Sequence, residues 1–217
     1  MLGYRHHYHA GNFADALKYF VLYEVIKYQN RKEIPYLYLD THAGAGLYLL
    51  DDKNQEFKDG LGKLLKNIQK IKNPELREFL EFLRLNQPPN QVLGSALIAA
   101  KLLRNTDTLR CCELHPSDYP LLVKNLAQLR KKRTVIEQND GFHALISLLP
   151  PPSKRAVVLI DPPYEIKSDY LKLVKNLEIA LKKFPQAVIL VWYPLLSSFE
   201  AQNLPKNLDK LGKKLKI

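Results

Sequence analysis

The stretch VVLIDPPYEIKSDY, residues 157–170, places a carboxylate, two prolines and an aromatic ring directly after four apolar residues. The Asp161 carboxylate can accept hydrogen bonds, and so can the Pro162 carbonyl, whose own nitrogen carries no hydrogen to compete. Tyr164 offers a flat face on which an aromatic base can stack, as enzymes that act on flipped-out bases require. The structural alternative is a turn that only ends a strand. We interpret the pattern as a pocket for a flat, hydrogen-bonding ligand.

The ligand that best suits these groups is an aromatic amine. Its amino nitrogen is a weak nucleophile, because the lone pair is delocalised into the ring. Two acceptors, the Asp161 carboxylate and the Pro162 carbonyl, would hold both N–H bonds, raise the electron density on nitrogen and fix its direction. The pattern therefore indicates attack by a base amino group on an electrophile bound beside it.

A glycine-rich turn, DTHAGAG at residues 40–46, follows another predicted strand. Its glycines, Gly44 and Gly46, let the backbone adopt positive φ and approach a ligand closely. The spacing matches neither the dinucleotide-binding pattern nor the phosphate-binding loop. Alone, the turn is equally typical of an ordinary tight connection.

Acidic residues at other strand ends give the turn more meaning. Glu113, at the end of the second predicted strand, can accept hydrogen bonds from both hydroxyls of a ribose. Asp140, beside Gly141, can accept a hydrogen bond from the exocyclic amino group of an adenine. Each has a plain alternative as a helix cap or surface ion pair. Taken together in strand order, they favour a nucleoside site and suggest S-adenosylmethionine as the electrophile.

Strands alternate with helices along the chain, and apolar runs replace strict alternation. This pattern is typical of a parallel sheet covered on both faces, a doubly wound α/β fold that binds ligands at the carboxyl ends of its strands. The predicted strands are 35–40, 108–115, 133–140, 155–161 and 186–194, in the sheet order three-two-one-four-five. The predicted helices are 15–28, begun by Asn12 or Asp15, 116–129, begun by Ser117 or Asp118, 141–149 and 169–184.

Three segments are expected. Residues 1–50 form the N-terminal tail, a helix and the first strand; residues 51–106 form a helical insertion; and residues 107–217 form the remainder of the domain. KKLKI, residues 213–217, is expected to begin a sixth strand, so that the final hairpin of the sheet is missing from this chain.

Charge is the informative bulk property. The chain has 217 residues, with 33 Lys and Arg against 22 Asp and Glu, a net charge of +11. The excess favours a polyanionic partner, because released counterions drive binding to phosphate backbones. Basic clusters are Lys63, Lys66, Lys70 and Lys72; RKKR at 130–133; and Lys206, Lys210, Lys213, Lys214 and Lys216. For any one cluster, a merely solvated face explains the pattern as well.

The remaining features indicate a cytoplasmic protein. The N-terminus lacks the apolar core of a signal peptide, and no apolar run is long enough to span a bilayer. Cys111 and Cys112 are adjacent, so they point to opposite faces of a strand and are expected to stay reduced. HHYH, residues 6–9, lacks partners at metal-ligand spacing, and no metal site is predicted.

DPPY resembles the fourth motif of amino-methyltransferases that modify adenine N6 or cytosine N4, and DTHAGAG is similar to their first motif, with His42 in place of the usual aromatic residue. More narrowly, YRHHYHAGNFADALK, LYLDTHAGAG, ELHPSDYPLL, DGF and LIDPPYE resemble the RlmJ-type family. These bacterial enzymes methylate an adenine N6 of 23S ribosomal RNA. The resemblance covers most of the chain, from residue 1 to about residue 193.

The resemblance implies a role for each matching residue. Asp161 is expected to be the catalytic carboxylate, with Pro162 and Tyr164 beside it. The S-adenosylmethionine pocket is expected to comprise Tyr19, His42, Gly44, Gly46, Ser95, Glu113, Asp140, Gly141 and Asp161. Tyr4, Lys18 and Tyr164 are expected to meet the substrate nucleotide. Tyr19 stands where a histidine is usual in the family.

The expected activity is therefore S-adenosylmethionine-dependent methylation of protein-free 23S ribosomal RNA by a monomer that binds no membrane. Two alternatives stay open. One is a DNA adenine-N6 or cytosine-N4 methyltransferase, since the four-residue motif does not separate RNA from DNA. The other is a non-catalytic nucleic-acid-binding protein linked to catabolism of external DNA.

Overall fold

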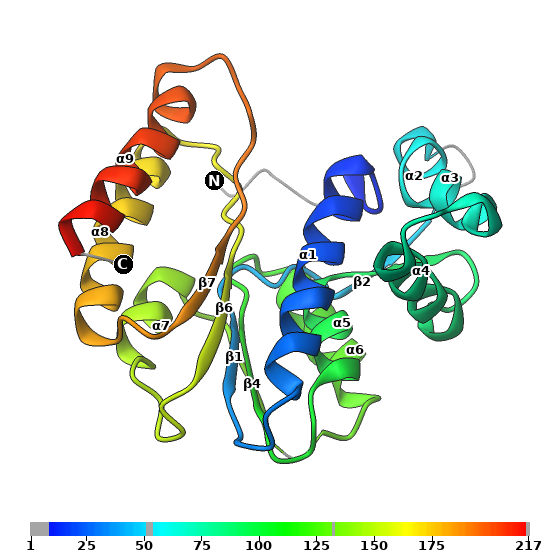
Figure 1. The fold of residues 1–217 in the computed structure, drawn as a ribbon, viewed down its shortest axis with the longest axis horizontal. Helices are drawn as coiled ribbons and strands as arrows, with labels where there is room; N and C mark the ends of the chain where they lie inside the picture. Colours follow the sequence, from blue (N-terminus) through cyan, green and yellow to red (C-terminus); the bar gives the residue numbers. More distant parts are fainter. Residues whose placement is uncertain (1–8, 51–53, 132, 216–217) are drawn as a thin grey trace. The chain divides into compact units, whose positions relative to one another are not determined.

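The computed structural model describes residues 9–50, 54–131 and 133–215. Contacts divide the chain into two compact units, whose segments alternate along the sequence (Figure 1). The first unit comprises Met1–Glu33, Ala43–Asn105 and His115–Lys132; the second comprises Ile34–His42, Thr106–Leu114 and Arg133–Ile217.

The second unit is built on a five-stranded parallel sheet. Its strands are β1 (Leu37–Asp40), β4 (Thr108–Cys112), β5 (Thr134–Glu137), β6 (Ala156–Ile160) and β7 (Val188–Val191). They lie in the order β5-β4-β1-β6-β7, which is three-two-one-four-five counted among these strands along the chain. The predicted doubly wound α/β fold is confirmed. Each strand is shorter than predicted, because the predicted ranges include flanking residues at one or both ends.

The two central strands explain why the sheet is parallel. Every residue of β1 and of β6 is buried, so both faces of each strand are covered. β6 has the sequence AVVLI, whose β-branched residues suit a pleated, enclosed strand. β1 pairs with β4 on one side and β6 on the other, in a register that sets Asp40 opposite Cys111 and Leu159.

Three helices of the second unit pack on one face of the sheet (Figure 1). They are α7 (Gly141–Ser147), α8 (Ser168–Lys183) and α9 (Phe199–Leu215). Leu173 and Leu177 of α8 and Leu204 of α9 are among the buried residues of this core. The expectation of a sixth strand beginning at residue 213 is wrong, because Lys213 and Lys214 lie in the last turn of α9. The helix is strongly amphipathic, and its apolar stripe places Leu204 and Leu211 against the core.

The first unit begins with the long helix α1 (Phe13–Asn30). Asn12 is its N-cap: the Asn12 side chain accepts a hydrogen bond from the Asp15 backbone N–H at 2.9 Å. Of the two caps that the sequence offered, Asn12 is therefore the one used. α1 packs against α4 (Pro74–Asn86) and α5 (Ser95–Leu102).

The segment expected to be a helical insertion is more varied than predicted. It contains α2 (Gln55–Asp59), α3 (Leu61–Lys66), a short 3₁₀ helix η2 (Ile68–Lys70) and α4. It also contains β3 (Gln91–Leu93), which pairs antiparallel with β2 (Leu47–Leu49), and α5. The predicted helices of this segment are broken at Pro74 and at QPPN, and the strand β3, which follows QPPN, was not predicted. Three-residue strands are too short to show a period of two, so the pattern gave no signal for this pair.

The last helix of the first unit is α6 (Asp118–Ala127). Ser117 occupies its N-cap position but its side chain makes no capping hydrogen bond. No helix within the described part of the chain combines the length and the apolar character needed to cross a bilayer.

Candidate active site at the carboxyl edge of the sheet

The acidic residues singled out from the sequence follow the ends of parallel strands. Asp40 ends β1, Glu113 follows β4 and Asp161 follows β6. The Glu113 backbone N–H donates to the Glu137 carbonyl at 3.1 Å, so the ladder between β4 and β5 continues to this residue. Because parallel strands end at the same edge of a sheet, these side chains belong to one edge. Asp40 is fully buried, and the Tyr38 hydroxyl donates to it at 3.2 Å.

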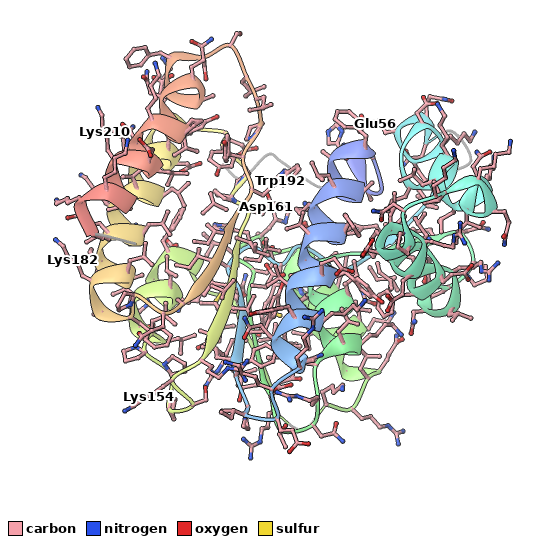
Figure 2. All side chains as sticks on the ribbon, in the orientation of Figure 1. Glu56, Lys154, Asp161, Lys182, Trp192 and Lys210 are labelled. Carbon is pink, nitrogen blue, oxygen red and sulfur yellow. The ribbon has the colours of Figure 1, made fainter. Side chains whose placement is uncertain are left out.

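The Asp161-Pro162-Pro163-Tyr164 turn is tied to the end of β7. The Trp192 backbone N–H donates to the Ile160 carbonyl at 2.9 Å, and the Tyr164 hydroxyl donates to the Trp192 carbonyl at 2.7 Å. Figure 2 labels Asp161 and Trp192 beside the ends of β6 and β7. Tyr164 has a φ of 52°, a left-handed conformation that is unfavourable for a bulky residue. Such a conformation persists only where the surrounding contacts impose it, and the hydroxyl bond is one of these contacts.

The Tyr164 ring is largely enclosed. It is 9% exposed, and its centroid lies 4.7 Å from that of Tyr170. Burial, and then the charge of Asp161, raise the pKa of the Tyr164 hydroxyl, which therefore stays protonated and keeps donating to Trp192. A base could stack only on the part of the ring that Tyr170 does not cover. Through its hydroxyl bond, the Tyr164 side chain also has a structural role that the sequence did not indicate.

His42 is held in a defined orientation by Thr41. The Thr41 hydroxyl donates to the Leu159 carbonyl at 3.0 Å, and its oxygen lies 2.8 Å from His42 Nδ1. A hydroxyl has one hydrogen, and that hydrogen is used on Leu159, so His42 Nδ1 must be the donor in the second contact. The other ring nitrogen, Nε2, then carries a lone pair and can accept a hydrogen bond.

The His42 ring is kept neutral by its surroundings. Desolvation lowers the pKa of His42 to about 4, although the charges of Asp161 and Asp140 act in the opposite direction. Phe142 packs edge-on against the imidazole, with centroids 5.2 Å apart. A neutral acceptor thus stands near two carboxylates.

Asp140 and Gly141 bring α7 against the end of β1. Asp140 is the N-cap of α7 and accepts from the Phe142 backbone N–H at 2.8 Å, so the helix-cap alternative describes part of its role. A Cβ atom on Gly141 would lie 1.9 Å from the Thr41 carbonyl oxygen. Only glycine therefore lets the start of α7 approach the backbone beside His42 so closely.

The glycine turn belongs to the first unit, and its geometry is determined there. Gly44 has a φ of 58°, and a Cβ atom on it would lie 2.1 Å from the Tyr48 hydroxyl. Gly46 has a φ of 73°, and its carbonyl accepts from the Gly94 backbone N–H at 2.7 Å. This bond joins the turn to the start of α5, where Ser95 is buried as the first helical residue. Gly46 and Ser95 are therefore brought together.

Lys18 and Tyr19 are both buried on α1. The Lys18 ammonium lies 2.9 Å from an Asp15 carboxylate oxygen and 5.1 Å from the Tyr19 ring centroid. The other Asp15 oxygen accepts from the Gly11 backbone N–H at 2.8 Å. The predicted nucleotide-binding lysine is thus part of a buried ion pair that also fixes the chain before α1.

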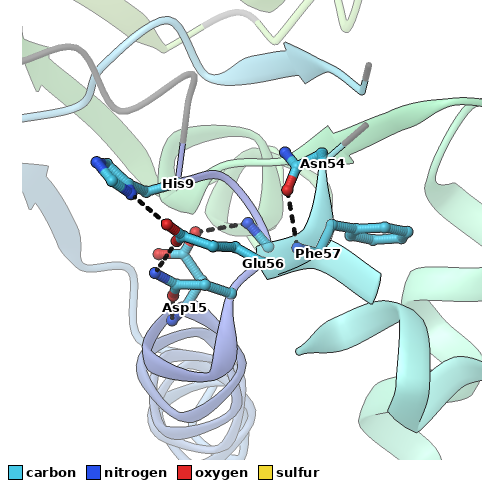
Figure 3. A network of polar contacts seen from close by, with 7 residues as sticks. His9, Asp15, Asn54, Glu56 and Phe57 are labelled. Atoms are coloured by element: carbon cyan, nitrogen blue, oxygen red, sulfur yellow. Dashed lines mark hydrogen bonds and ion pairs between the residues drawn. The ribbon is translucent and has the colours of Figure 1, made fainter. Parts of the chain in front are cut away.

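The histidine cluster is only partly within the described residues. Tyr4, His6 and His7 lie outside them. His9 Nδ1 lies 2.9 Å from Glu56, which also accepts from the Asn12 side chain at 3.1 Å (Figure 3). Burial opposes ionisation of Glu56, but the Asn12 and His9 contacts hold its pKa below the ordinary value. No group of three His, Cys, Asp or Glu side chains suited to a metal ion occurs within the part of the chain that is described.

Sequence reasoning missed three residues that shape the site. Thr41 orients His42, Phe142 packs on its ring, and the Trp192 backbone anchors Tyr164. A short hydroxyl residue directly after a buried strand was the available signal for Thr41. The Trp192 contacts are made by its backbone, so the type of its side chain could not indicate them.

Replacement of Gly141 should destabilise the protein. In Gly141→Ala the new methyl group would overlap the Thr41 carbonyl, so α7 or β1 must move, at a cost of about 1–3 kcal/mol in the free energy of unfolding. Gly212→Ala, inside α9, is the matched control and should gain about 0.5–1 kcal/mol from helix propensity. Urea unfolding of both variants tests this. A Gly141→Ala protein as stable as wild type would contradict the close approach.

The His42 pKa predicts a loss of stability in mild acid. The folded pKa is about 4, below the ordinary 6.5, so the unfolded chain binds a proton first as the pH falls. The stability that neutral His42 gives the folded protein is therefore fully present above pH 6.5 and is lost as the pH falls toward 4. Between about pH 7 and 5, wild type should lose about 1–2 kcal/mol more than His42→Gln. Urea unfolding at both pH values measures the difference, and equal losses would show that His42 titrates normally.

Comparisons with known proteins agree with this architecture. A family model described as ribosomal RNA large subunit methyltransferase D, RlmJ, matches residues 33–217. The chain is 39% identical to ribosomal RNA large subunit methyltransferase J of Escherichia coli K12 and 38% identical to the protein of the same name from Haemophilus influenzae. Each alignment covers 98% of this chain and 77% of the relative.

A solved structure supports the fold. The crystal structure of a Legionella pneumophila protein matches with a TM-score of 0.85 and 34% identity, over 94% of this chain and 76% of the other. Family model and relatives both span far more than half of the chain. The protein therefore belongs to the RlmJ family of ribosomal RNA large subunit methyltransferases.

Proposed function

We propose that this protein transfers a methyl group from S-adenosylmethionine to the N6 amino group of an adenine in 23S ribosomal RNA. The observation that carries the proposal is the fixed turn at Asp161, Pro162 and Tyr164, placed at the carboxyl end of β6 in a member of this family. S-adenosylmethionine, when bound, supplies the methyl group.

The acceptors at the carboxyl edge suit a cationic methyl donor. Neutral His42 offers an Nε2 lone pair, and the carboxylates of Asp140 and Asp161 are close enough to influence the pKa of that ring. Opposite charges attract strongly where water is partly excluded, so this edge favours a sulfonium and an ammonium group. Glu113, after β4, is proposed to accept hydrogen bonds from the ribose hydroxyls.

Asp161 and Pro162 are proposed to hold the base. The Asp161 carboxylate accepts one N6–H bond and the Pro162 carbonyl accepts the other, so the lone pair points away from both. The nitrogen becomes cationic when the new bond to carbon forms, and the negative charge of Asp161 stabilises it. Its proton then leaves toward Asp161. An aryl amine is too weak an acid to give up that proton to a carboxylate beforehand.

Tyr164 has two proposed roles. Its hydroxyl bond to Trp192 keeps the turn in the strained conformation that positions Asp161 and Pro162. Stacking of the base on the ring is the second role, and it requires that the side chains covering the ring shift when the base enters. Lys18, Tyr19, Gly44, Gly46 and Ser95 keep their proposed roles in binding substrate or cofactor, and so does Tyr4 outside the described residues.

RNA is favoured over DNA as the substrate because the curated relatives are named for ribosomal RNA. Protein-free 23S ribosomal RNA and a monomeric enzyme remain part of the proposal. A tritium-transfer assay with unmodified ribosomal RNA, duplex DNA and single-stranded DNA separates the alternatives. Label on DNA alone would favour a DNA methyltransferase, and no label on any of them would favour a non-catalytic binding protein.

Asp161→Asn should slow methyl transfer by orders of magnitude in single-turnover assays at saturating donor. The amide keeps the shape but loses the charge that stabilises the cationic nitrogen. Asp209→Asn, an exposed position on α9, is the matched control and should react at the wild-type rate. Transfer by Asp161→Asn at the wild-type rate would make the turn purely structural.

Glu113→Ala should weaken S-adenosylmethionine binding by about 1–3 kcal/mol, the cost of leaving buried hydroxyls without partners. Isothermal titration calorimetry measures the affinity directly. Glu75→Ala, an exposed residue in the first turn of α4, serves as control and should bind normally. Unchanged affinity in a folded Glu113→Ala protein would place the ribose elsewhere.

A further inference from the structure

The first unit contains an apolar pocket. It lies among α1, α2, α3 and α4 and has a volume of about 320 Å³, at the lower end of the sizes typical of small-molecule sites. Residues that matter for its chemistry are Phe13, Leu17, Phe20, Asp59, Lys63 and Leu64. Nothing in the reaction derived above uses this pocket.

The mouth of the pocket exposes large apolar side chains. Phe13 is 80% exposed and Leu17 is 57% exposed, and they lie one turn apart on the same face of α1. Phe20, which also lines the pocket and is half-buried, packs against Phe79, with ring centroids 5.8 Å apart. The pocket thus combines an exposed aromatic ring with a fixed one, an arrangement suited to a flat ligand.

The segment that contains α3 and η2 carries a surplus of positive charge. Between residues 58 and 72 the chain has five lysines and one acidic residue, Asp59. Within the described ranges, no ion pair occupies Lys63, Lys66, Lys70 or Lys72, whereas Glu78 and Glu81 of α4 are paired with Lys27 and Arg84. This balance favours a polyanion over an apolar peptide as the occupant.

We propose that this pocket binds an unpaired nucleobase of the RNA substrate, at a position other than the target adenine. Phe13 stacks on the base, and Lys63 contacts a neighbouring phosphate. Sequence-specific RNA recognition commonly uses unstacked bases held on aromatic side chains in this way. The proposal rests on the proposed function, because it identifies a second point at which the RNA substrate is held.

Asp59 gives the pocket a preference among bases. One of its carboxylate oxygens accepts from the Gln55 side chain at 2.8 Å, and a carboxylate has further lone pairs to offer. These lone pairs can accept from an exocyclic amino group, which cytosine has and uracil lacks. The pocket should therefore prefer cytosine to uracil.

The test measures binding of short fluorescein-labelled oligocytidylate and oligouridylate to the full chain by fluorescence anisotropy at fixed salt. Phe13→Ala should weaken oligocytidylate binding about 5- to 150-fold, the range seen when a stacking aromatic residue is removed. Phe13→Tyr should restore it. Leu85→Ala, at an 80% exposed apolar position of α4, is the matched control and should bind like wild type.

Two further variants test the polar groups. Asp59→Asn should reduce the preference for cytidylate over uridylate, because an amide can pair with either base. Lys63→Ala should lower the slope of log affinity against log salt by about 0.7, the value for one phosphate contact on a single strand. Unchanged preference and unchanged slope in these variants would overturn the assignment of both residues.

Other outcomes are equally decisive. If Phe13→Ala and Leu85→Ala bind oligocytidylate with equal affinity, the pocket does not bind RNA. If sedimentation shows a wild-type dimer that Phe13→Ala dissociates, the exposed ring serves self-association and the proposal is wrong. Methyl transfer to ribosomal RNA by wild type is scored separately. A wild type that binds oligocytidylate through Phe13 but methylates no RNA would contradict the proposed function and leave the pocket in place.

Discussion

β1 is hydrogen-bonded to a parallel strand on each side, and the geometry of the candidate active site follows from this four-residue strand. Its register with β4 and β6 sets the carboxyl ends of all three strands at one edge. The ladder then continues past the strand, since the Thr41 backbone N–H and hydroxyl both donate to Leu159. That second bond determines the tautomer of His42. A backbone pairing thereby fixes which atom of a side chain can accept a hydrogen bond.

The second unit keeps local strain at the point where the proposed chemistry needs rigidity. A tyrosine at φ 52° costs free energy, which a partly buried hydroxyl bond and packing against Tyr170 offset. The same trade occurs at Gly141, where the absence of a side chain permits contact between α7 and the Thr41 carbonyl. Both contacts hold backbone acceptors and carboxylates before a ligand arrives. Such preorganisation is what makes electrostatic stabilisation of a developing charge effective.

The sheet order and the position of the acidic strand ends could be predicted because apolar runs and their polar termini are local patterns. The doubly wound arrangement restricts how such runs can be joined. Other features depend on contacts between distant residues. β3 has only three residues, and its pairing with β2 is visible only once the chain has folded. KKLKI predicts a strand only when it is separated from the preceding amphipathic turns of α9, which Lys213 and Lys214 continue. The structural role of Tyr164 depends on a carbonyl 28 residues away, which no local pattern reveals.

The local distribution of charge in this protein explains its proposed function better than its net charge does. A chain with a net charge of +11 would be expected to repel a cationic methyl donor. In the proposed function, the carboxyl edge of the sheet avoids that conflict through a neutral imidazole and several carboxylates. The lysines of residues 58–72, in contrast, have few acidic neighbours in sequence. Charges beyond a Debye length of about 8–10 Å are largely screened in physiological salt, so the charges nearest a ligand matter more than the net charge of the protein. Attraction of a polyanion and binding of a cation can therefore coexist in one small protein, provided that each depends on local groups.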